Sequence, residues 1–129
     1  MIVDSSALVA IVVGEPDAES LLERLTTGPA PARVSAVGLV EATIVVEARQ
    51  GPDATRDLRL LLSGAGVEVV PVTEEQAALA IGAWRRFGKG RHPAGLKLGD
   101  CFAYAAARAC CEPLLFKGGD FAQTDVPAA

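Results

Sequence analysis

Four acidic residues lie in or next to apolar segments, at positions where solubility alone does not require a charge. Asp4 ends the apolar opening of the chain, and Asp120 follows the apolar stretch "EPLLF". Glu41 lies among the apolar residues of "SAVGLVEATIV", and Asp100 begins the small, apolar segment "DCFAYAAARA". Clustered carboxylates repel one another unless a cation neutralises them, and oxygen-only ligands select hard ions. If the four converge, they predict a site for Mg²⁺ or Mn²⁺.

Each acid also has an ordinary structural interpretation. Asp100 suits the first turn of a helix, and Asp120 suits a tight turn. Glu41 could face solvent from the side of its helix, and "DSS" after an apolar stretch suits a helix start. These interpretations stay open for each acid taken singly, whereas all four together favour a metal site.

The helices and strands that must position these acids can be predicted from the sequence, in which short apolar stretches are separated by segments with helical patterns. Strands are predicted over residues 1–4, 33–35, 66–72 and 112–116, with a possible edge strand at 124–126. Helices are predicted between the strands. The first begins at a cap, Ser5 or Ser6, and ends at Gly14, and the second begins after Pro16. The others are predicted over 37–49, 52–62, 73–87 and 98–111, and a short turn or helix is predicted over 119–122. Short buried strands separated by helices predict a mainly parallel sheet covered on both faces. The predicted fold class is α/β, a three-layer α/β/α arrangement, and we expect a single domain with one core over residues 1–129.

This architecture gives the acids a common location. In open α/β sheets, ligands bind beyond the carboxyl ends of the strands, where Asp4 and Asp120 would lie. Val37, Val40, Ile44 and Val45 indicate the core face of helix 37–49, and helical spacing places Glu41 on the same side as Val37, Ile44 and Val45. A carboxylate on that face is partly desolvated and requires a cation or a hydrogen-bond donor.

The charge balance narrows the class of partner. A net charge of −4 excludes a protein that binds nucleic acid through a global positive field, although residues 85–97 form a local basic segment. Metal ions held by carboxylates hydrolyse phosphodiesters, so the acids and this segment together predict a polyanionic substrate. Arg91 and Lys97 are the candidates for contacts with the backbone of this substrate.

The cysteines and the hydropathy pattern indicate the compartment. The three cysteines, Cys101, Cys110 and Cys111, are odd in number and clustered, so we expect reduced core thiols rather than disulfides. His92 is the only histidine, which leaves no paired spacing for a zinc site. No apolar stretch is long enough to span a membrane, and no signal peptide is visible, so a cytoplasmic protein without membrane contact is expected.

Four stretches together resemble a known family. They are "MIVDSSALVAI", "SAVGLVEATIV", "KLGDCFAYAAARA" and "EPLLFKGGDFAQTDV", and in this order they are similar to PIN-domain ribonucleases of the VapC toxin type. The resemblance implies a PIN-like fold, an endoribonuclease that requires Mg²⁺ or Mn²⁺, a cognate VapB-type antitoxin, an RNA substrate and a homodimer.

The resemblance also assigns site residues. Asp4, Glu41, Asp100 and Asp120 match the family's catalytic, metal-binding acids, with Asp125 as the alternative for the fourth. Ser6 resembles the family's hydroxyl beside the first aspartate, which is expected to orient a carboxylate by a hydrogen bond. Because Gly119 stands where many relatives place a polar residue, either one or two metal ions are compatible with the pattern.

Other functions use similar residues. The same acids would serve a PIN-fold nuclease in RNA processing or DNA cleavage, and a non-catalytic binding module could keep the fold. A receiver-like phosphatase is less consistent, since it needs paired acids at one strand end and residues 1–6 supply only Asp4. Tyr104 is expected to pack in the core, and Trp84 to form a core or dimer contact.

Overall fold

The computed structural model describes residues 1–129 and has a four-stranded parallel sheet in the order β3-β2-β1-β4. Its strands are β1 (Ile2–Val3), β2 (Arg33–Ser35), β3 (Glu68–Val70) and β4 (Leu114–Leu115). The helices are α1 (Ser5–Val13), α2 (Ala18–Thr26), α3 (Ala36–Gln50), α4 (Pro52–Gly64), α5 (Glu74–Phe87) and α6 (Leu98–Cys110), followed by a 3₁₀ helix, η1 (Phe121–Gln123). The predicted α/β class with a parallel sheet is confirmed.

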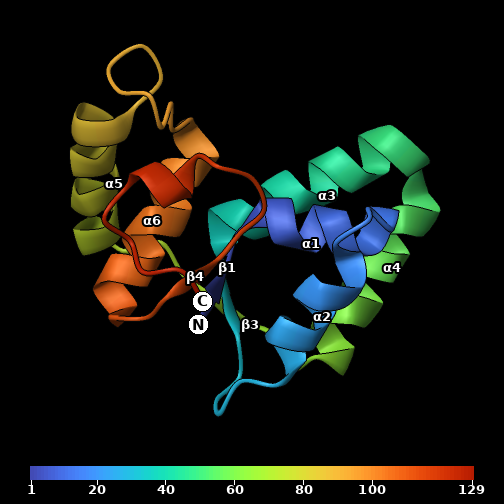
Figure 1. The fold of residues 1–129 in the computed structure, drawn as a ribbon. Coiled ribbons are helices and arrows are strands. Elements are labelled where there is room, and N and C mark those ends of the chain that lie inside the picture. Colours follow the sequence, from blue (N-terminus) through green and yellow to red (C-terminus); the bar gives the residue numbers. More distant parts are fainter.

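Helices cover the sheet on both faces. Helices α5 and α6 lie on one side, and α1 to α4 lie on the other (Figure 1). Because successive strand residues point to opposite faces, Ile2 and Leu114 pack with α5 and α6, while Val3 and Leu115 pack with α1 to α4. The sheet therefore separates two apolar cores, where the length of the chain had predicted one.

Local signals set most helix ends. Gly14 ends α1 in the left-handed conformation, at a φ of 78°, and Thr73 caps α5 by accepting a hydrogen bond from the Gln76 N–H (3.1 Å). The predicted cap of α1 is wrong, because Asp4 takes that position instead of Ser5 or Ser6. Asp4 keeps the extended backbone of β1 (φ −80°, ψ 155°), whereas both serines are already helical.

Two predicted strands differ from the structure. The strand expected to be buried over 66–72 is the edge strand β3, and its Val69 is 49% exposed because β3 has a neighbour on one side only. Residues 124–126 form no strand. Ala128 makes an isolated bridge to Leu114 instead, so the chain reaches the sheet edge two residues later than predicted.

The cysteines are all free, as expected, but their burial differs along α6. Cys101 is buried in the core against α5, while Cys111 is exposed beyond the end of the helix. The prediction of core thiols therefore holds for Cys101 and is wrong for Cys111. No helix of the chain combines the length and apolarity that crossing a membrane requires.

Candidate functional site

Asp4 lies at the carboxyl end of β1 and is 2% exposed. Its N–H donates to the carbonyl oxygen of Leu115 (2.8 Å), which ties it to β4, and its Oδ2 accepts from the Ser6 N–H (3.0 Å). Burial raises the pKa of Asp4 to about 6, and the nearby charges of Asp100 and Glu41 act in the same direction. Hydrogen bonds from the hydroxyl and N–H of Ser6 lower that pKa in part. Asp4 is thus a buried carboxyl group with acidic neighbours.

Glu41 projects from α3 toward the start of two other helices. The Ser5 hydroxyl donates to Glu41 Oε1. On the other side, a Cβ added to Gly99 would lie 2.6 Å from Glu41 Cδ. Ser5 follows Asp4 and Gly99 precedes Asp100, so the Glu41 carboxylate lies between two acids that are far apart in sequence.

The face of α3 differs from the prediction. Val40 and Ile44 are 58% and 62% exposed, and they do not belong to the core as expected. The buried side of α3 carries smaller residues, namely Gly38, Ala42 and Val46. Glu41 lies at the border of that buried side and is half-buried, which is consistent with the partial desolvation that was expected.

Asp100 lies in the first turn of α6. Its Oδ2 accepts from the Lys97 N–H (2.9 Å), which stabilises the helix start. Burial raises the pKa of Asp100, and the charges of Glu41 and Asp120 raise it further. Asp4, Glu41 and Asp100 are therefore electrostatic neighbours.

The fourth acid had two candidates, and the structure separates them. Asp125 accepts a hydrogen bond from the Tyr104 hydroxyl (2.7 Å) and pairs with Arg86 (3.2 Å), and both contacts lower its pKa. Asp120 is exposed, and its charge acts on Asp100. Asp120 thus lies close enough to Asp100 to raise its pKa, while Asp125 is engaged with Tyr104 and Arg86. Tyr104 is buried, as expected of a packing residue.

The donor set fits a hard cation. None of the six ion pairs in the chain includes Asp4, Glu41, Asp100 or Asp120, so no protein cation pairs with their charge. As the side chains stand, no three acids, histidines or cysteines are grouped closely enough to hold a metal ion. Asp4, Glu41 and Asp100 each accept instead from a nearby protein donor. All the ligand atoms are carboxylate oxygens, which suit Mg²⁺ or Mn²⁺, and coordination requires these side chains to turn toward one another.

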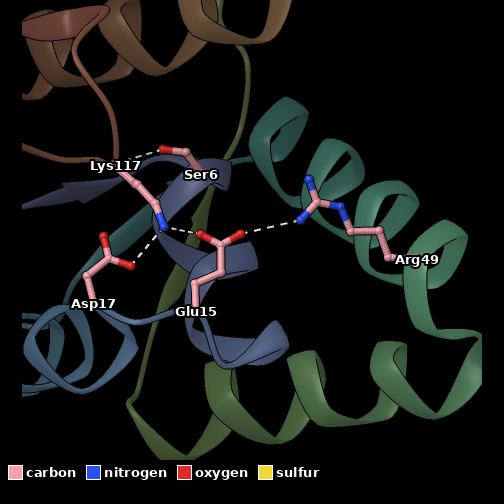
Figure 2. Close-up of polar contacts among 5 residues, drawn as sticks. All are labelled: Ser6, Glu15, Asp17, Arg49 and Lys117. Carbon is pink, nitrogen blue, oxygen red and sulfur yellow. Dashed lines mark hydrogen bonds and ion pairs between the residues drawn. The ribbon is translucent and has the colours of Figure 1, made fainter.

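Three residues in contact with the site are not among the predicted site residues, although Ser5 was already a candidate cap of the helix that follows Asp4. Ser5 donates to Glu41, and Gly99 gives Glu41 room. The third is Lys117, whose N–H donates to Ser6 Oγ (3.0 Å) and whose ammonium contacts Glu15 and Asp17 (Figure 2). A glycine beside an acid at a helix start is a visible signal of close approach. Lys117 gave no signal, because its partners are about a hundred residues away in the sequence.

The basic segment lies next to the acids through its last residue. Lys97 is exposed and directly precedes α6, so it is close to Asp100 in the chain. Arg91 is also exposed, and its guanidinium lies over the ring of Trp84, 4.2 Å from the ring centroid. Trp84 is 46% exposed and is therefore not a core residue. His92 Nδ1 accepts from the Ala94 N–H (3.0 Å), a local turn contact.

Comparisons with known proteins show which family this chain resembles. The family model described as "PIN domain" matches residues 1–127. A protein named Ribonuclease VapC from Mycolicibacterium smegmatis is 49% identical over 128 residues, which cover 99% of this chain and 98% of that protein. Ribonuclease VapC30 from Mycobacterium tuberculosis is 45% identical over 126 residues, which cover 98% of this chain and 95% of its own length.

Solved structures show the same fold at much lower identity. The crystal structure of Mycobacterium tuberculosis VapC20 has a TM-score of 0.81 at 19% identity and covers 99% of this chain and 97% of its own. A toxin–antitoxin complex from Klebsiella pneumoniae has a TM-score of 0.74 at 18% identity, with coverage of 99% and 95%. With a family match over nearly the whole chain and full-length relatives at 45–49% identity, this chain belongs to the PIN-domain family and, within it, to the VapC ribonucleases.

Proposed function

We propose that this protein is an Mg²⁺- or Mn²⁺-dependent endoribonuclease toxin that hydrolyses RNA at the site formed by Asp4, Glu41, Asp100 and Asp120. The observation that carries the proposal is the position of Glu41 between Ser5 and Gly99, beside Asp4 and Asp100. This arrangement gathers negative charge from three separate segments without a protein cation. Such a grouping is costly to the fold unless a ligand compensates it, and it therefore indicates a functional role.

The proposed roles of the four acids follow from their positions in the fold. Asp4 is the most rigid, because it is buried, bound to β4 through its N–H and held by Ser6. Glu41 and Asp100 supply further carboxylate oxygens from α3 and α6, and Asp120 supplies the exposed one. When bound, Mg²⁺ or Mn²⁺ lowers the pKa of water and offsets charge on the phosphate. The carboxylates would fix where that ion is held, while cations beside the site would contact the phosphodiester.

The substrate must approach an acidic site, so cations beside it are needed. We assign this role to Lys97 and Arg91, which are both exposed. Lys97 is three residues from Asp100, and Arg91 is held over Trp84, which limits the conformations it has to lose on binding. Both would neutralise RNA phosphates on the α6 side of the site.

A cognate VapB-type antitoxin is the proposed regulator of this activity. The Klebsiella pneumoniae structure of similar fold is described as a toxin–antitoxin complex, and that of VapC20 as a sarcin–ricin loop cleaving toxin, which supports an antitoxin partner and an RNA substrate here. A homodimer in the cytoplasm completes the proposal. Exposed apolar side chains on α3 and α5, including Ile44 and Ile81, offer surface for such a dimer.

The test is cleavage of total RNA by purified, antitoxin-free protein. Wild type is incubated with Mn²⁺, with Mg²⁺ or with a chelator, next to Asp4→Asn and Asp100→Asn. An Asp53→Asn variant is the control, since Asp53 is an exposed acid at the start of α4. We expect discrete fragments that require metal and are absent with the two site variants. Intact RNA with wild type, or equal cutting by the site variants, contradicts the proposal and favours a binding module.

A matched DNA substrate separates the alternative nuclease functions. Oligonucleotides that carry the mapped cleavage sequence as RNA or as DNA are compared under the same conditions. Cutting of RNA alone supports the endoribonuclease. Equal cutting of both contradicts it and favours a nuclease that ignores the 2′-hydroxyl.

A further inference from the structure

Lys117 contacts the start of α1 and the segment between α1 and α2. Its N–H donates to Ser6 Oγ (3.0 Å), and Ser6 in turn donates its own N–H to Asp4 Oδ2 (3.0 Å). The Lys117 ammonium contacts Glu15 and reaches Asp17 Oδ1 at 2.9 Å, between α1 and α2 (Figure 2). Lys117 is thus fixed through its backbone and through its side chain, against segments that follow Asp4 in the sequence.

The residues after Lys117 have little to hold them. Gly118 adopts a φ of 93°, and a Cβ added to Gly118 or Gly119 would meet nothing within 4 Å. Asp120 then follows as an exposed residue. The next contacts are the Asp120 carbonyl oxygen, which accepts from the Gln123 N–H (3.2 Å), and Phe121, which is buried and lies 5.2 Å from Phe116 between ring centroids. The two glycines before Asp120 therefore lie between one anchor at Lys117 and another at the start of η1.

The same cluster borders the acids. A cleft of about 340 Å³ is lined by Ser5, Ser6, Glu15, Glu41, Arg49 and Lys117, among others. Glu15 also pairs with Arg49 of α3 (3.4 Å), so two cations share one carboxylate (Figure 2). Lys117 has two carboxylate partners, whereas the guanidinium of Arg49 is more exposed and has one. The charges of this cluster compensate one another, so Lys117 is better suited to hold position than to bind a phosphate.

We propose that Lys117 is a positioning residue, which fixes the turn 118–120 over the start of α1 and thereby sets the place of Asp120 relative to Asp4 and Asp100. This inference rests on the proposed function for the metal role of Asp120. The metal role of Asp120 then depends on Lys117, which is not one of the four acids. Residues that orient metal ligands typically change metal affinity 10–100-fold when they are removed.

The variants separate the side chain of Lys117 from its backbone. Lys117→Met keeps the N–H that donates to Ser6 and most of the aliphatic chain, but it removes the charge. Lys117→Arg keeps a charge able to contact both Glu15 and Asp17. Arg49→Met is the matched control, because it removes the other partner of Glu15 without touching the turn.

The first measurement is amide hydrogen exchange of residues 116–124 in metal-free protein. Lys117→Met is expected to exchange faster in this segment alone, while Lys117→Arg and Arg49→Met match wild type. An unchanged rate in Lys117→Met overturns the proposal. A uniform rise over the whole chain overturns it as well, because it would reflect a loss of global stability.

The second measurement is the dissociation constant for Mn²⁺ in a double-mutant cycle with Asp120→Asn. We expect Lys117→Met to bind Mn²⁺ about tenfold more weakly, and Lys117→Met/Asp120→Asn to bind no more weakly than Asp120→Asn alone. Effects that multiply would show that Lys117 does not act through Asp120 and overturn the proposal. If wild type bound no Mn²⁺, the proposed function would fail, while hydrogen exchange would still decide whether Lys117 orders the turn.

Discussion

The Cα of Gly99 faces the carboxylate of Glu41 so closely that a side chain at residue 99 has no space. A Cβ there would lie 2.6 Å from Glu41 Cδ. The obstructed group is the end of a flexible side chain, so Glu41 can turn away without disturbing the backbone. Gly99 therefore protects the orientation of an acid more than it protects the fold.

We predict that Gly99→Ala folds with nearly unchanged stability but loses most of its RNA cleavage and metal binding. Alanine favours the helix by up to about 1 kcal/mol, which offsets the contact with Glu41, while the displaced carboxylate leaves the site. Thermal unfolding and Mn²⁺ titration check this. Gly82→Ala in α5 is the control, because its Cβ would meet nothing within 4 Å. Full activity in Gly99→Ala would show that the Glu41 orientation is not needed.

The buried carboxyl of Asp4 predicts a pH-dependent cost to stability in the presence of chelator. Its pKa of about 6 in the folded state lies above the ordinary value of 3.8, so ionisation disfavours the fold. The contribution of the protonated Asp4 carboxyl group to the free energy of unfolding is fully present below about pH 4. It is lost as the pH rises through 6, by about 3 kcal/mol in total. Asp4→Asn keeps a cap for α1 and lacks this charge.

Urea unfolding of both proteins from about pH 4 to pH 8 isolates the contribution of Asp4. Asp4→Asn should gain stability relative to wild type as the pH rises, with little difference at the acidic end. The paired acids Glu15, Asp17, Glu112 and Asp125 have lowered pKa values and act in the opposite direction, but they are common to both proteins. If the free energies of unfolding of the two proteins differed by the same amount at every pH, the raised pKa of Asp4 would be contradicted.

Asp120→Asn and Asp125→Asn should fail in different ways. Asp120→Asn is expected to lower metal-dependent cleavage with little change in stability, since Asp120 is exposed. Asp125→Asn weakens the contacts to Tyr104 and Arg86, so it should lower stability by about 1 kcal/mol and keep cleavage. Cleavage assays and thermal unfolding on both variants decide the matter. The reverse pattern would make Asp125 the functional acid.

Lys97→Met should weaken RNA binding without altering the metal affinity. The Lys97 side chain is exposed and carries one charge beside Asp100, so its loss should reduce the salt dependence of binding by about one phosphate contact. Binding is measured on a catalytically inactive Asp4→Asn background at several salt concentrations. Arg24→Met on α2 is the control cation. Equal salt dependence in Lys97→Met and the control would remove Lys97 from the proposed RNA path.

The sequence predicted the features that depend on local signals. Gly14 and Gly51 end their helices as expected, and β2 has the predicted bounds, Arg33–Ser35. Asp4 was expected directly after the first strand, beyond its carboxyl end, and it lies there. These inferences required only spacing, caps and the topology of alternating strands and helices.

What depends on distant neighbours could not be predicted in the same way. The exposure of Val69 follows from the place of β3 at the sheet edge, and the exposure of Ile44 follows from which helices pack on α3. Ser5 meets Glu41 across 36 residues, and Lys117 meets Glu15 across 102. No periodicity within one segment encodes such pairs.

The division of the interior by the sheet has a consequence for the site. Glu41 belongs to α3, which packs in one core, while Asp100 and the Phe121 that follows Asp120 belong to the other. Asp4 follows β1, which contributes a residue to each core. The acids therefore meet at the seam between two halves, which are joined by the short strands and by the direct contact of α3 with α6. A small slide of one half past the other would separate the carboxylates while each core stayed intact. Cleavage would then report the alignment of the two halves more sensitively than unfolding does.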